Sequence, residues 1–398
     1  MYIKSDHIYF PNQIVKKGYL EVNGNQFGEV YATVPECAEV VDYTDYMIVP
    51  GFIDQHLHGW GTGSYANDKS VHSVNEMKKN LPYEGVTSFL ATSGAEPIED
   101  LVEGIKNVSY IVENQKDDGA TCLGVHLEGP FINKEFKGMQ REDCCIDPSL
   151  EIMQQFMDAQ SLDHVIKLMT IAPELPNAKE VIKYCKEHQI QLNIGHSAAT
   201  FECISELKEY GLGGVTHMFS GMKGLHHREL GVAGSAMYYD DLTCEFAKQT
   251  GMTVKPEAFA LIWKLKSKDK IIMTTDCGGI ALSNRKKYHY IRKETFIPDG
   301  DYLVIESHDG SQRRIKRDDY NQVRDLELSY IKSIQNLIQN VHPSVHEVVK
   351  VTAENPAKYI NVYDKKGSLE KGKDADFLVV DKDFNIEVTY CMGKPYKM

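Results

Sequence analysis

The run MIVPGFIDQHLHG at positions 47–59 decides the fold of this 398-residue chain. It begins as an apolar, β-rich segment and ends in polar side chains that include Asp54, His56 and His58. His56 and His58 are two residues apart on an extended backbone, so both imidazoles project to the same side and can bind one metal ion. The run therefore predicts a buried strand, at 47–54, whose carboxyl end carries functional groups.

Seven more β-rich runs follow and mostly alternate with segments of helical spacing. The strands are expected at 86–91, 122–128, 165–171, 190–195, 214–217, 242–246 and 270–275. Apolar residues recur at helical spacing over 97–115, 148–160, 177–188, 200–210 and 256–266, and again over 326–341 and 345–360. Eight β/α units in this order predict an α/β fold of the (β/α)₈ barrel type.

The two ends of the chain have a different pattern, with short strands and turns and no long helix. We expect residues 1–49 and 361–398 to form one small β-sandwich module beside a catalytic barrel at 50–360. Residues 286–316 also alternate like strands around the turn Asp309-Gly310. They predict a hairpin inserted after the eighth barrel strand.

Composition limits the classes of partner. Lys and Arg total 44 against 57 Asp and Glu, a net charge of -13, which disfavours nucleic acid and anionic lipid as partners. The first residues are charged, and no apolar run approaches the roughly 18 residues of a membrane span. The nine Cys are odd in number and form no CxxC pair, which argues against a disulfide scaffold or a zinc ribbon. We expect a cytoplasmic protein with no membrane partner.

Residue types that bind metals follow five of the expected strands. They are His56 and His58, then Glu128, His196, His217 and Asp276. The carboxyl ends of barrel strands converge on one face, where barrel enzymes keep their active sites. A single His in a sequence is usually solvated or hydrogen-bonded. The co-location of five strand ends instead favours a metal centre in which His196 and His217 hold a second ion and Glu128 is placed to bridge.

Several motifs, spread over nearly the whole chain, resemble one enzyme family. They are PGFIDQHLHG at 50–59, HLEGPF at 126–131, TIAPE at 170–174, GHS at 195–197, THMF at 216–219, HRE at 227–229, TD at 275–276 and KGKDADF at 371–377. In this order they resemble the amidohydrolase superfamily, and within it the N-acetylglucosamine-6-phosphate deacetylases. The HLEGPF segment is the best single marker of the deacetylases.

The resemblance implies roles for the expected ligands. Glu128, His196 and His217 would bind one ion, and Glu128 would take the bridging role that a carboxylated Lys has in many relatives. The retained His56 and His58 would allow a second ion. Asp276 would be the catalytic acid/base. His and carboxylate ligands suit zinc or iron first, with manganese, cobalt and nickel as alternatives, as one ion or two.

The positions that bind substrate in the family match less well. By position, the resemblance implies Gln140, Ser220, Gly221, Arg228 and Thr253 as substrate-binding residues. Gln140 stands where the family has a His, Ser220-Gly221 replaces an Asn-Ala pair, and Thr253 replaces another His. Arg228 is retained, and in the family the matching Arg reaches the substrate of a neighbouring subunit, which implies a homodimer.

New phosphate donors would have to replace those that are lost. Candidates are His226 and His227, the basic run at 285–287, or Arg313 and Arg314. The alternative interpretation of the basic runs is a solvated hairpin surface.

The expected reaction is metal-dependent hydrolytic deacetylation of an N-acetylated amino sugar, with N-acetylglucosamine 6-phosphate as the first candidate and the free amino sugar and acetate as products. One alternative is a related amidohydrolase that acts on another amide, such as an N-acyl amino acid, a cyclic amide or an isoaspartyl dipeptide. A second is a metal-free barrel that binds a sugar as a sensor. The complete ligand set argues against the sensor.

Overall fold

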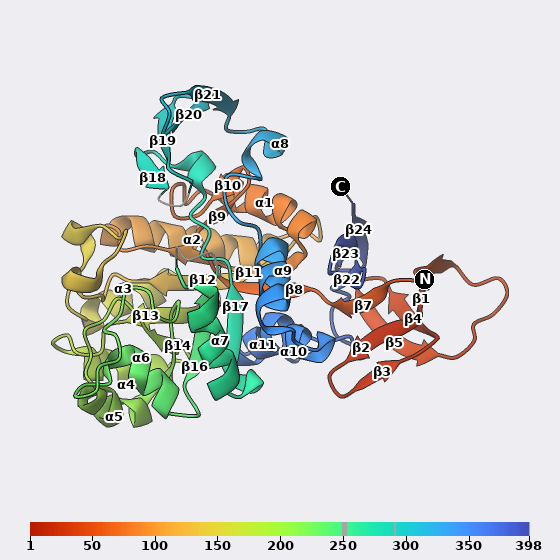
Figure 1. Ribbon diagram of the computed structural model, residues 1–398, viewed down its shortest axis with the longest axis horizontal. Coiled ribbons are helices and arrows are strands. Elements are labelled where there is room, and N and C mark those ends of the chain that lie inside the picture. Colours follow the sequence, from red (N-terminus) through yellow and green to blue (C-terminus); the bar gives the residue numbers. More distant parts are fainter. Residues whose placement is uncertain (249–252, 290–291, 398) are drawn as a thin grey trace.

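Eight parallel strands form a barrel in the computed structural model, which describes residues 1–248, 253–289 and 292–397 (Figure 1). The strands are β8 (Phe52–Leu57), β11 (Val86–Ser93), β12 (Thr121–Glu128), β13 (Ile166–Ile171), β14 (Gln191–Ile194), β15 (Leu212–Val215), β16 (Thr243–Ala247) and β17 (Ile271–Thr274). They pair in chain order from β8 to β17. The chain beyond β17 then returns to β8, where the Asp276 amide donates to the His56 carbonyl at 2.9 Å. The predicted (β/α)₈ fold is confirmed.

One strand that the sequence predicts forms two separate strands in the structure. The segment predicted at 47–54 divides into β7 (Met47–Pro50), which pairs with β22 (Phe377–Val380) outside the barrel, and the barrel strand β8. Gly51 separates them, and a Cβ there would lie 2.3 Å from the Thr87 side chain. A residue without a side chain therefore lets the backbone pass from one sheet to the other at close approach.

Helices cover the outside of the barrel (Figure 1). They are α1 (Val71–Asn80), α2 (Ile98–Asn114), α3 (Leu150–Asp158), α4 (Ala178–Glu187), α5 (Phe201–Leu207), α6 (Gly231–Tyr238) and α7 (Pro256–Leu265). Ser70, Ser149 and Thr200 begin three of them, and each side chain accepts a backbone N–H of the first turn. The sequence prediction lacks α1 and α6. Most residues of α6 are small and buried, so no one-sided apolar pattern marks it.

The chain returns to helix after the insertion. These helices are α8 (Tyr320–Val323), α9 (Tyr330–Val341), α10 (Val345–Val349) and α11 (Asn355–Tyr359). A π-helical turn at Lys350–Glu354 joins α10 to α11, so the helix expected over 345–360 is irregular at its centre. The expected helix at 326–341 begins at Tyr330, after the Ser329 cap.

Both ends of the chain form two small sheets beside the barrel (Figure 1). One has the order β5-β4-β1-β6 and the other β24-β23-β22-β7-β2-β3. Their strands are β1 (Tyr2–Ser5), β2 (His7–Phe10), β3 (Gln13–Val15), β4 (Gly18–Asn23), β5 (Gln26–Tyr31), β6 (Val40–Asp42), β23 (Ile386–Cys391) and β24 (Lys394–Tyr396), with β7 and β22. An apolar cluster that includes Ile3, Leu20 and Phe377 fills the space between the sheets.

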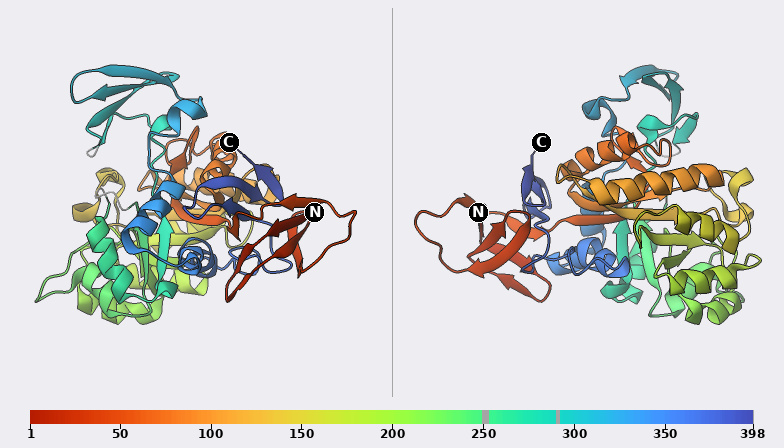
Figure 2. Two further views of the ribbon diagram at one scale, coloured as in Figure 1. Left: turned by 45° about the vertical axis from the view of Figure 1, so that its right-hand side comes forward. Right: turned by 180° about the vertical axis from the view of Figure 1, so that it is seen from behind.

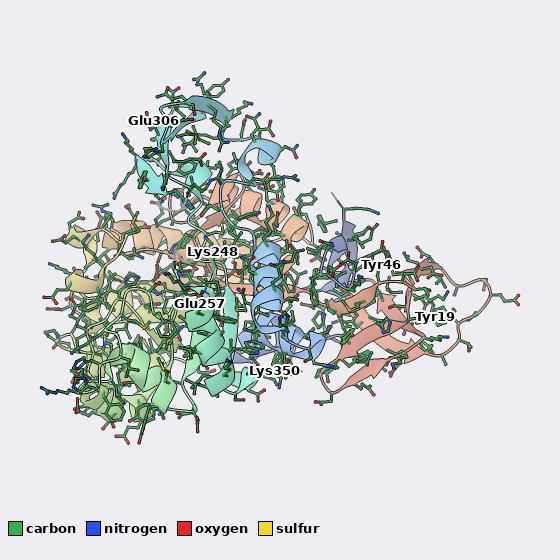
Figure 3. The ribbon with its side chains drawn as sticks, in the orientation of Figure 1. Tyr19, Tyr46, Lys248, Glu257, Glu306 and Lys350 are labelled. Carbon is green, nitrogen blue, oxygen red and sulfur yellow. The ribbon has the colours of Figure 1, made fainter. Side chains whose placement is uncertain are left out.

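The expected hairpin after the eighth strand is larger than predicted. Four antiparallel strands form it, β18 (Lys287–His289), β19 (Glu294–Asp299), β20 (Tyr302–Ser307) and β21 (Gln312–Lys316). Figure 2 shows this sheet standing away from the barrel, and Glu306 marks it in Figure 3. Phe296, Leu303 and Ile305 give it an apolar cluster of its own with residues near α8. A short hairpin, β9 (Gly59–Trp60) and β10 (Gly63–Ser64), follows β8. No helix among the described residues is long and apolar enough to cross a membrane.

Lys366 joins the barrel to the terminal sheets and gives a prediction for stability. Its buried Nζ lies 2.8 Å from Asp374 Oδ2, 2.7 Å from Asp376 Oδ2 and 3.1 Å from Thr121 Oγ1 on β12. Burial raises the pKa of Asp376, and Lys366 opposes that rise. We expect Lys366→Met to lower the free energy of unfolding by about 3–5 kcal/mol, because it leaves two carboxylates without their cation. Urea denaturation measures the change.

Lys371→Met is the matched control, since it removes an equally close but exposed ion pair with Glu29 at 2.7 Å. Exposed pairs contribute little, so its unfolding midpoint should stay at the wild-type value. Equal midpoints for both variants would contradict the role given to Lys366.

Candidate metal centre and active site

The structure brings all six expected metal and acid residues together at the carboxyl end of the barrel. They divide into two groups, His56 with His58 and Asp276, and Glu128 with His196 and His217. In each group the candidate ligand atoms lie within 4.8 Å of one another. Each residue stands at or just beyond the end of a strand, as the sequence pattern predicts.

Glu128, the last residue of β12, lies between the two pairs of imidazoles. Its Oε1 is 2.9 Å from His217 Nε2, 3.1 Å from His196 Nε2 and 3.4 Å from His56 Nε2. Its Oε2 is 3.1 Å from His58 Nε2. One buried carboxylate therefore contacts both groups, which is the geometry that a bridging ligand requires.

Asp276 faces the first pair. Its Oδ1 lies 3.5 Å from His56 Nε2 and 3.3 Å from His58 Nε2. Asp276 is also the most exposed member of the cluster, with 20% of its side-chain surface exposed against 2% for Glu128. A carboxylate that touches the ligands and still reaches solvent can exchange a proton with a bound molecule.

The outer ring nitrogen of each of the four imidazoles, Nδ1, faces a hydrogen-bond acceptor that fixes the ring. His58 Nδ1 faces the Thr92 carbonyl at 3.1 Å, His196 Nδ1 the Phe136 carbonyl at 2.8 Å, His217 Nδ1 the Ser220 carbonyl at 3.1 Å, and His56 Nδ1 the Glu245 carboxylate at 2.7 Å. A neutral imidazole that donates from Nδ1 has a free lone pair on Nε2. Since all four Nε2 atoms face Glu128, the donor set fits a metal ion.

Two details support this fit. His56 Nε2 is buried and has no hydrogen-bond partner within the described ranges. His196 Nε2 and His217 Nε2 face each other at 3.2 Å, where two lone pairs would repel unless a proton or a cation lay near them. Divalent ions with nitrogen and oxygen ligands satisfy such sites.

The backbone is strained at three of the six residues. His196, His217 and Asp276 have φ angles of 47°, 30° and 48°, in the left-handed region. Each such residue costs on the order of 1–3 kcal/mol, and these conformations persist where the surrounding structure determines them. All three follow barrel strands at the same end of the barrel, β14, β15 and β17, which indicates that the backbone there is shaped by the site.

The charges of the cluster hold each other in ionised form. Burial works against the charged form of Glu128, but His56, His196 and His217 outweigh it and hold its pKa well below the usual range. Burial also opposes protonation of His58, yet Asp276 and Glu128 raise its pKa to about 9. The pKa of Asp276 is lowered in spite of burial, chiefly by His56 and His58. A divalent cation can replace the protons in such a balance.

Gln140, expected as a substrate-binding residue, lies against the metal centre. Its Nε2 donates to Glu128 Oε2 at 2.5 Å, and its Oε1 accepts the Ala95 amide at 2.8 Å. These two contacts fix the orientation of the amide. The second N–H of Nε2 is left for another acceptor.

Ser220, Gly221 and Thr253 lie together beside the centre. The Ser220 hydroxyl donates to the Thr253 carbonyl at 2.6 Å, and the Thr253 hydroxyl donates to the Ala247 and Lys248 carbonyls. Both hydroxyl groups therefore donate their hydrogen bonds to backbone carbonyls. Gly221 has a φ of +56°, and a Cβ there would lie 2.9 Å from His196 Nδ1, so only glycine fits behind the ligand. Residues 250–252, which precede Thr253, lie outside the described ranges.

Arg228 is not in the cluster. It lies on an exposed loop before α6, and its guanidinium has no partner among the described residues. The alternative donors Arg313 and Arg314 pair on the insertion, with Glu294 at 3.3 Å and Asp299 at 2.9 Å. These local pairs favour the solvated-surface interpretation of that basic run.

The sequence prediction missed Glu245. It is wholly buried on β16 between Cys244 and Phe246 and accepts a hydrogen bond from His56. A charged residue inside an otherwise apolar strand is the signal that could have identified it. Cys277, next to Asp276, is buried, and burial raises the pKa of its thiol, which suits a packing role.

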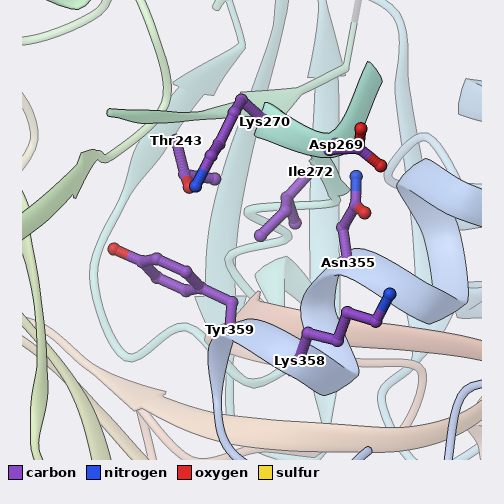
Figure 4. A pocket seen from close by; sticks show the side chains of 7 residues that line it. All are labelled: Thr243, Asp269, Lys270, Ile272, Asn355, Lys358 and Tyr359. Atoms are coloured by element: carbon purple, nitrogen blue, oxygen red, sulfur yellow. The ribbon is translucent and has the colours of Figure 1, made fainter. Parts of the chain in front are cut away.

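A cavity of about 340 Å³ lies at the opposite, amino-terminal end of the barrel (Figure 4). Its lining residues are Thr243, Asp269, Lys270, Ile272, Asn355, Lys358 and Tyr359. It includes none of the six clustered residues. In barrels of this type the amino-terminal face serves stability, so the candidate site remains the metal centre.

Comparison with known proteins agrees with this fold. The amidohydrolase family profile matches residues 47–396, and the chain belongs to that family. It is 30% identical to the N-acetylglucosamine-6-phosphate deacetylase of Bacillus subtilis, over 98% of this chain and 96% of the relative. It is 24% identical to the N-acetylgalactosamine-6-phosphate deacetylase of Escherichia coli O157:H7, over 92% of both. The crystal structure of the N-acetylglucosamine-6-phosphate deacetylase of Pasteurella multocida superposes with a TM-score of 0.84 at 25% identity, covering 100% of this chain and 99% of the other.

Proposed function

We propose that this chain hydrolyses the acetamide bond of N-acetylglucosamine 6-phosphate and releases acetate and the free amino sugar. The observation that carries the proposal is Glu128 placed among four imidazoles with Asp276 beside them. The full-length similarity to deacetylases of acetylated amino-sugar phosphates supports the choice of substrate.

His196 and His217, with Glu128, would hold one divalent ion, and His56 with His58 would hold a second next to Asp276. Nitrogen and carboxylate donors suit zinc or iron, and also manganese, cobalt or nickel. Such ions polarise an amide carbonyl and lower the pKa of water toward neutrality.

The side chains then have separate tasks. Asp276 accepts the proton of the attacking water on its carboxylate and delivers that proton to the departing amine nitrogen. Asp276 Oδ1 lies 3.3 Å from His58 Nε2, so that carboxylate stands beside the ion that His58 would hold. Gln140, oriented by Ala95 and Glu128, directs its remaining N–H toward the acetyl oxygen.

The test is amide hydrolysis by the metal-loaded protein, followed as acetate release from the acetylated sugars and as release of free amino acids from a dipeptide. N-acetylglucosamine 6-phosphate, N-acetylgalactosamine 6-phosphate and the unphosphorylated sugar are compared with an isoaspartyl dipeptide. Turnover of a sugar phosphate supports the proposal. If the fully loaded protein cleaves none of the sugars, the substrate assignment is wrong and the related amides become the candidates.

Arg228 is proposed to bind the phosphate. Its guanidinium is exposed and outside its own chain's cluster, which suits a homodimer in which it would serve a neighbouring subunit. A charge-assisted hydrogen bond contributes about 1.5–3 kcal/mol. We therefore expect Arg228→Ala to raise KM for the sugar phosphate about 10- to 100-fold with little change in kcat.

Steady-state kinetics measure this effect, and Arg313→Ala is the control because Arg313 pairs with Glu294 on the insertion. An unchanged KM in Arg228→Ala would remove Arg228 from the phosphate site. Sedimentation of the wild type tests the homodimer, and we expect the enzyme to be cytoplasmic.

A further inference from the structure

Glu245 is a wholly buried carboxylate that the proposed reaction does not use. It stands in the middle of β16, and its neighbours Cys244 and Phe246 are buried as well. A charge in such surroundings is unfavourable unless hydrogen bonds satisfy it. Its position is therefore explained only by the groups that it contacts.

Three donors hold the Glu245 carboxylate. Its Oε1 accepts from His56 Nδ1 at 2.7 Å and from the His217 backbone amide at 3.3 Å. Its Oε2 accepts from Gln55 Nε2 at 3.0 Å. Both carboxylate oxygens therefore accept hydrogen bonds from residues at strand ends. These bonds fix the carboxylate in place, and it in turn fixes the orientation of the His56 ring.

Glu245 also differs from the acceptors of the other three imidazoles. Those acceptors are neutral backbone carbonyls, of Thr92, Phe136 and Ser220. An ionised carboxylate can only accept, so His56 must donate from Nδ1 and keep its lone pair on Nε2. A carboxylate behind a ligand His also makes the imidazole a stronger donor to a metal.

The free nitrogen points into the cluster. His56 Nε2 is buried, has no hydrogen-bond partner in the part of the chain that the structure describes, and lies 3.4 Å from Glu128 Oε1 and 3.5 Å from Asp276 Oδ1. We propose that Glu245 is a positioning residue that sets the affinity of the ion site formed by His56 and His58. The proposal rests on the two-site centre proposed above.

The experiment is a zinc titration of metal-free wild type and Glu245→Gln, with stoichiometry from mass spectrometry and affinities from competition with a chelator. Glutamine keeps the shape of the side chain and its acceptor oxygen. We expect two ions in the wild type. In the variant, the ion at Glu128, His196 and His217 should be retained, while the second should bind about 10- to 100-fold more weakly.

Retention of the ion at Glu128, His196 and His217 would also show that the barrel of the variant is folded, because these ligands come from three strands. Glu84→Gln is the matched control, since Glu84 is a buried acid that contacts Tyr320 and none of the ligands. In a His56→Asn background, Glu245→Gln should produce no further weakening, which a general structural role would not predict.

Several outcomes would overturn the proposal. They are a single ion in the wild type, an unchanged second affinity in Glu245→Gln, and equal weakening of both sites. If Glu245→Gln is insoluble, Glu245→Asp is titrated instead, and it must weaken the second site alone. The ion ratio does not depend on acetate release, so a wrong substrate assignment would leave this result intact.

Discussion

Replacing Asp276 by asparagine is expected to lower kcat for deacetylation by about 10²- to 10⁴-fold, the range of general acid–base catalysis. Asparagine has the same shape, so the contacts with His56 and His58 at 3.5 and 3.3 Å can be kept by its carboxamide oxygen. It cannot take up the proton of water or return that proton to the amine. The loss should therefore fall on kcat, with KM close to that of the wild type.

Metal content must be measured on the same samples, because a variant that has lost ions would be inactive for another reason. Asp143→Asn is the control, since Asp143 pairs with Arg141 at 2.6 Å on an exposed loop and should keep full activity. A metal-replete Asp276→Asn that retains more than about a tenth of wild-type kcat would exclude the acid/base role.

The sequence predicts the barrel and the six clustered residues because both depend on local patterns. Alternation of strand and helix gives the order of the elements, and parallel strands must place residues such as Glu128 and Asp276 at one end. The family motifs then assign chemistry to positions that the alternation had already brought together.

Contacts between distant strands follow no such pattern. His56 and Glu245 are 189 positions apart and meet only because β8 and β16 face the same interior. Gln140 belongs to a loop, and only the folded chain shows that it contacts Glu128 at 2.5 Å. The sequence pattern makes β7 the start of β8, whereas in the structure it pairs with β2 and with β22, which is more than 300 residues later. The long-range pairing, set by packing, is therefore what the sequence pattern leaves open.

Glu128→Gln is expected to remove both ions and with them almost all activity. A neutral amide offers one weak acceptor oxygen in place of two charged ones, and Glu128 is the one residue of the cluster with oxygens within 3.5 Å of all four imidazoles. Loss of Lewis-acid stabilisation worth several kcal/mol corresponds to a fall in kcat/KM of about 10³- to 10⁴-fold.

The contrast with Glu245→Gln makes this prediction specific. Glu245 contacts the outer nitrogen of one ligand and should affect one ion, whereas Glu128 contacts the inner nitrogens of all four and should affect both. Glu174→Gln is the control. Glu174 Oε2 accepts a hydrogen bond from the Ser197 hydroxyl at 2.7 Å, in the loop after His196, and contacts no ligand nitrogen. Two ions bound to Glu128→Gln at wild-type affinity would show that the imidazoles alone hold the metals, and the bridging role of Glu128 would then be wrong.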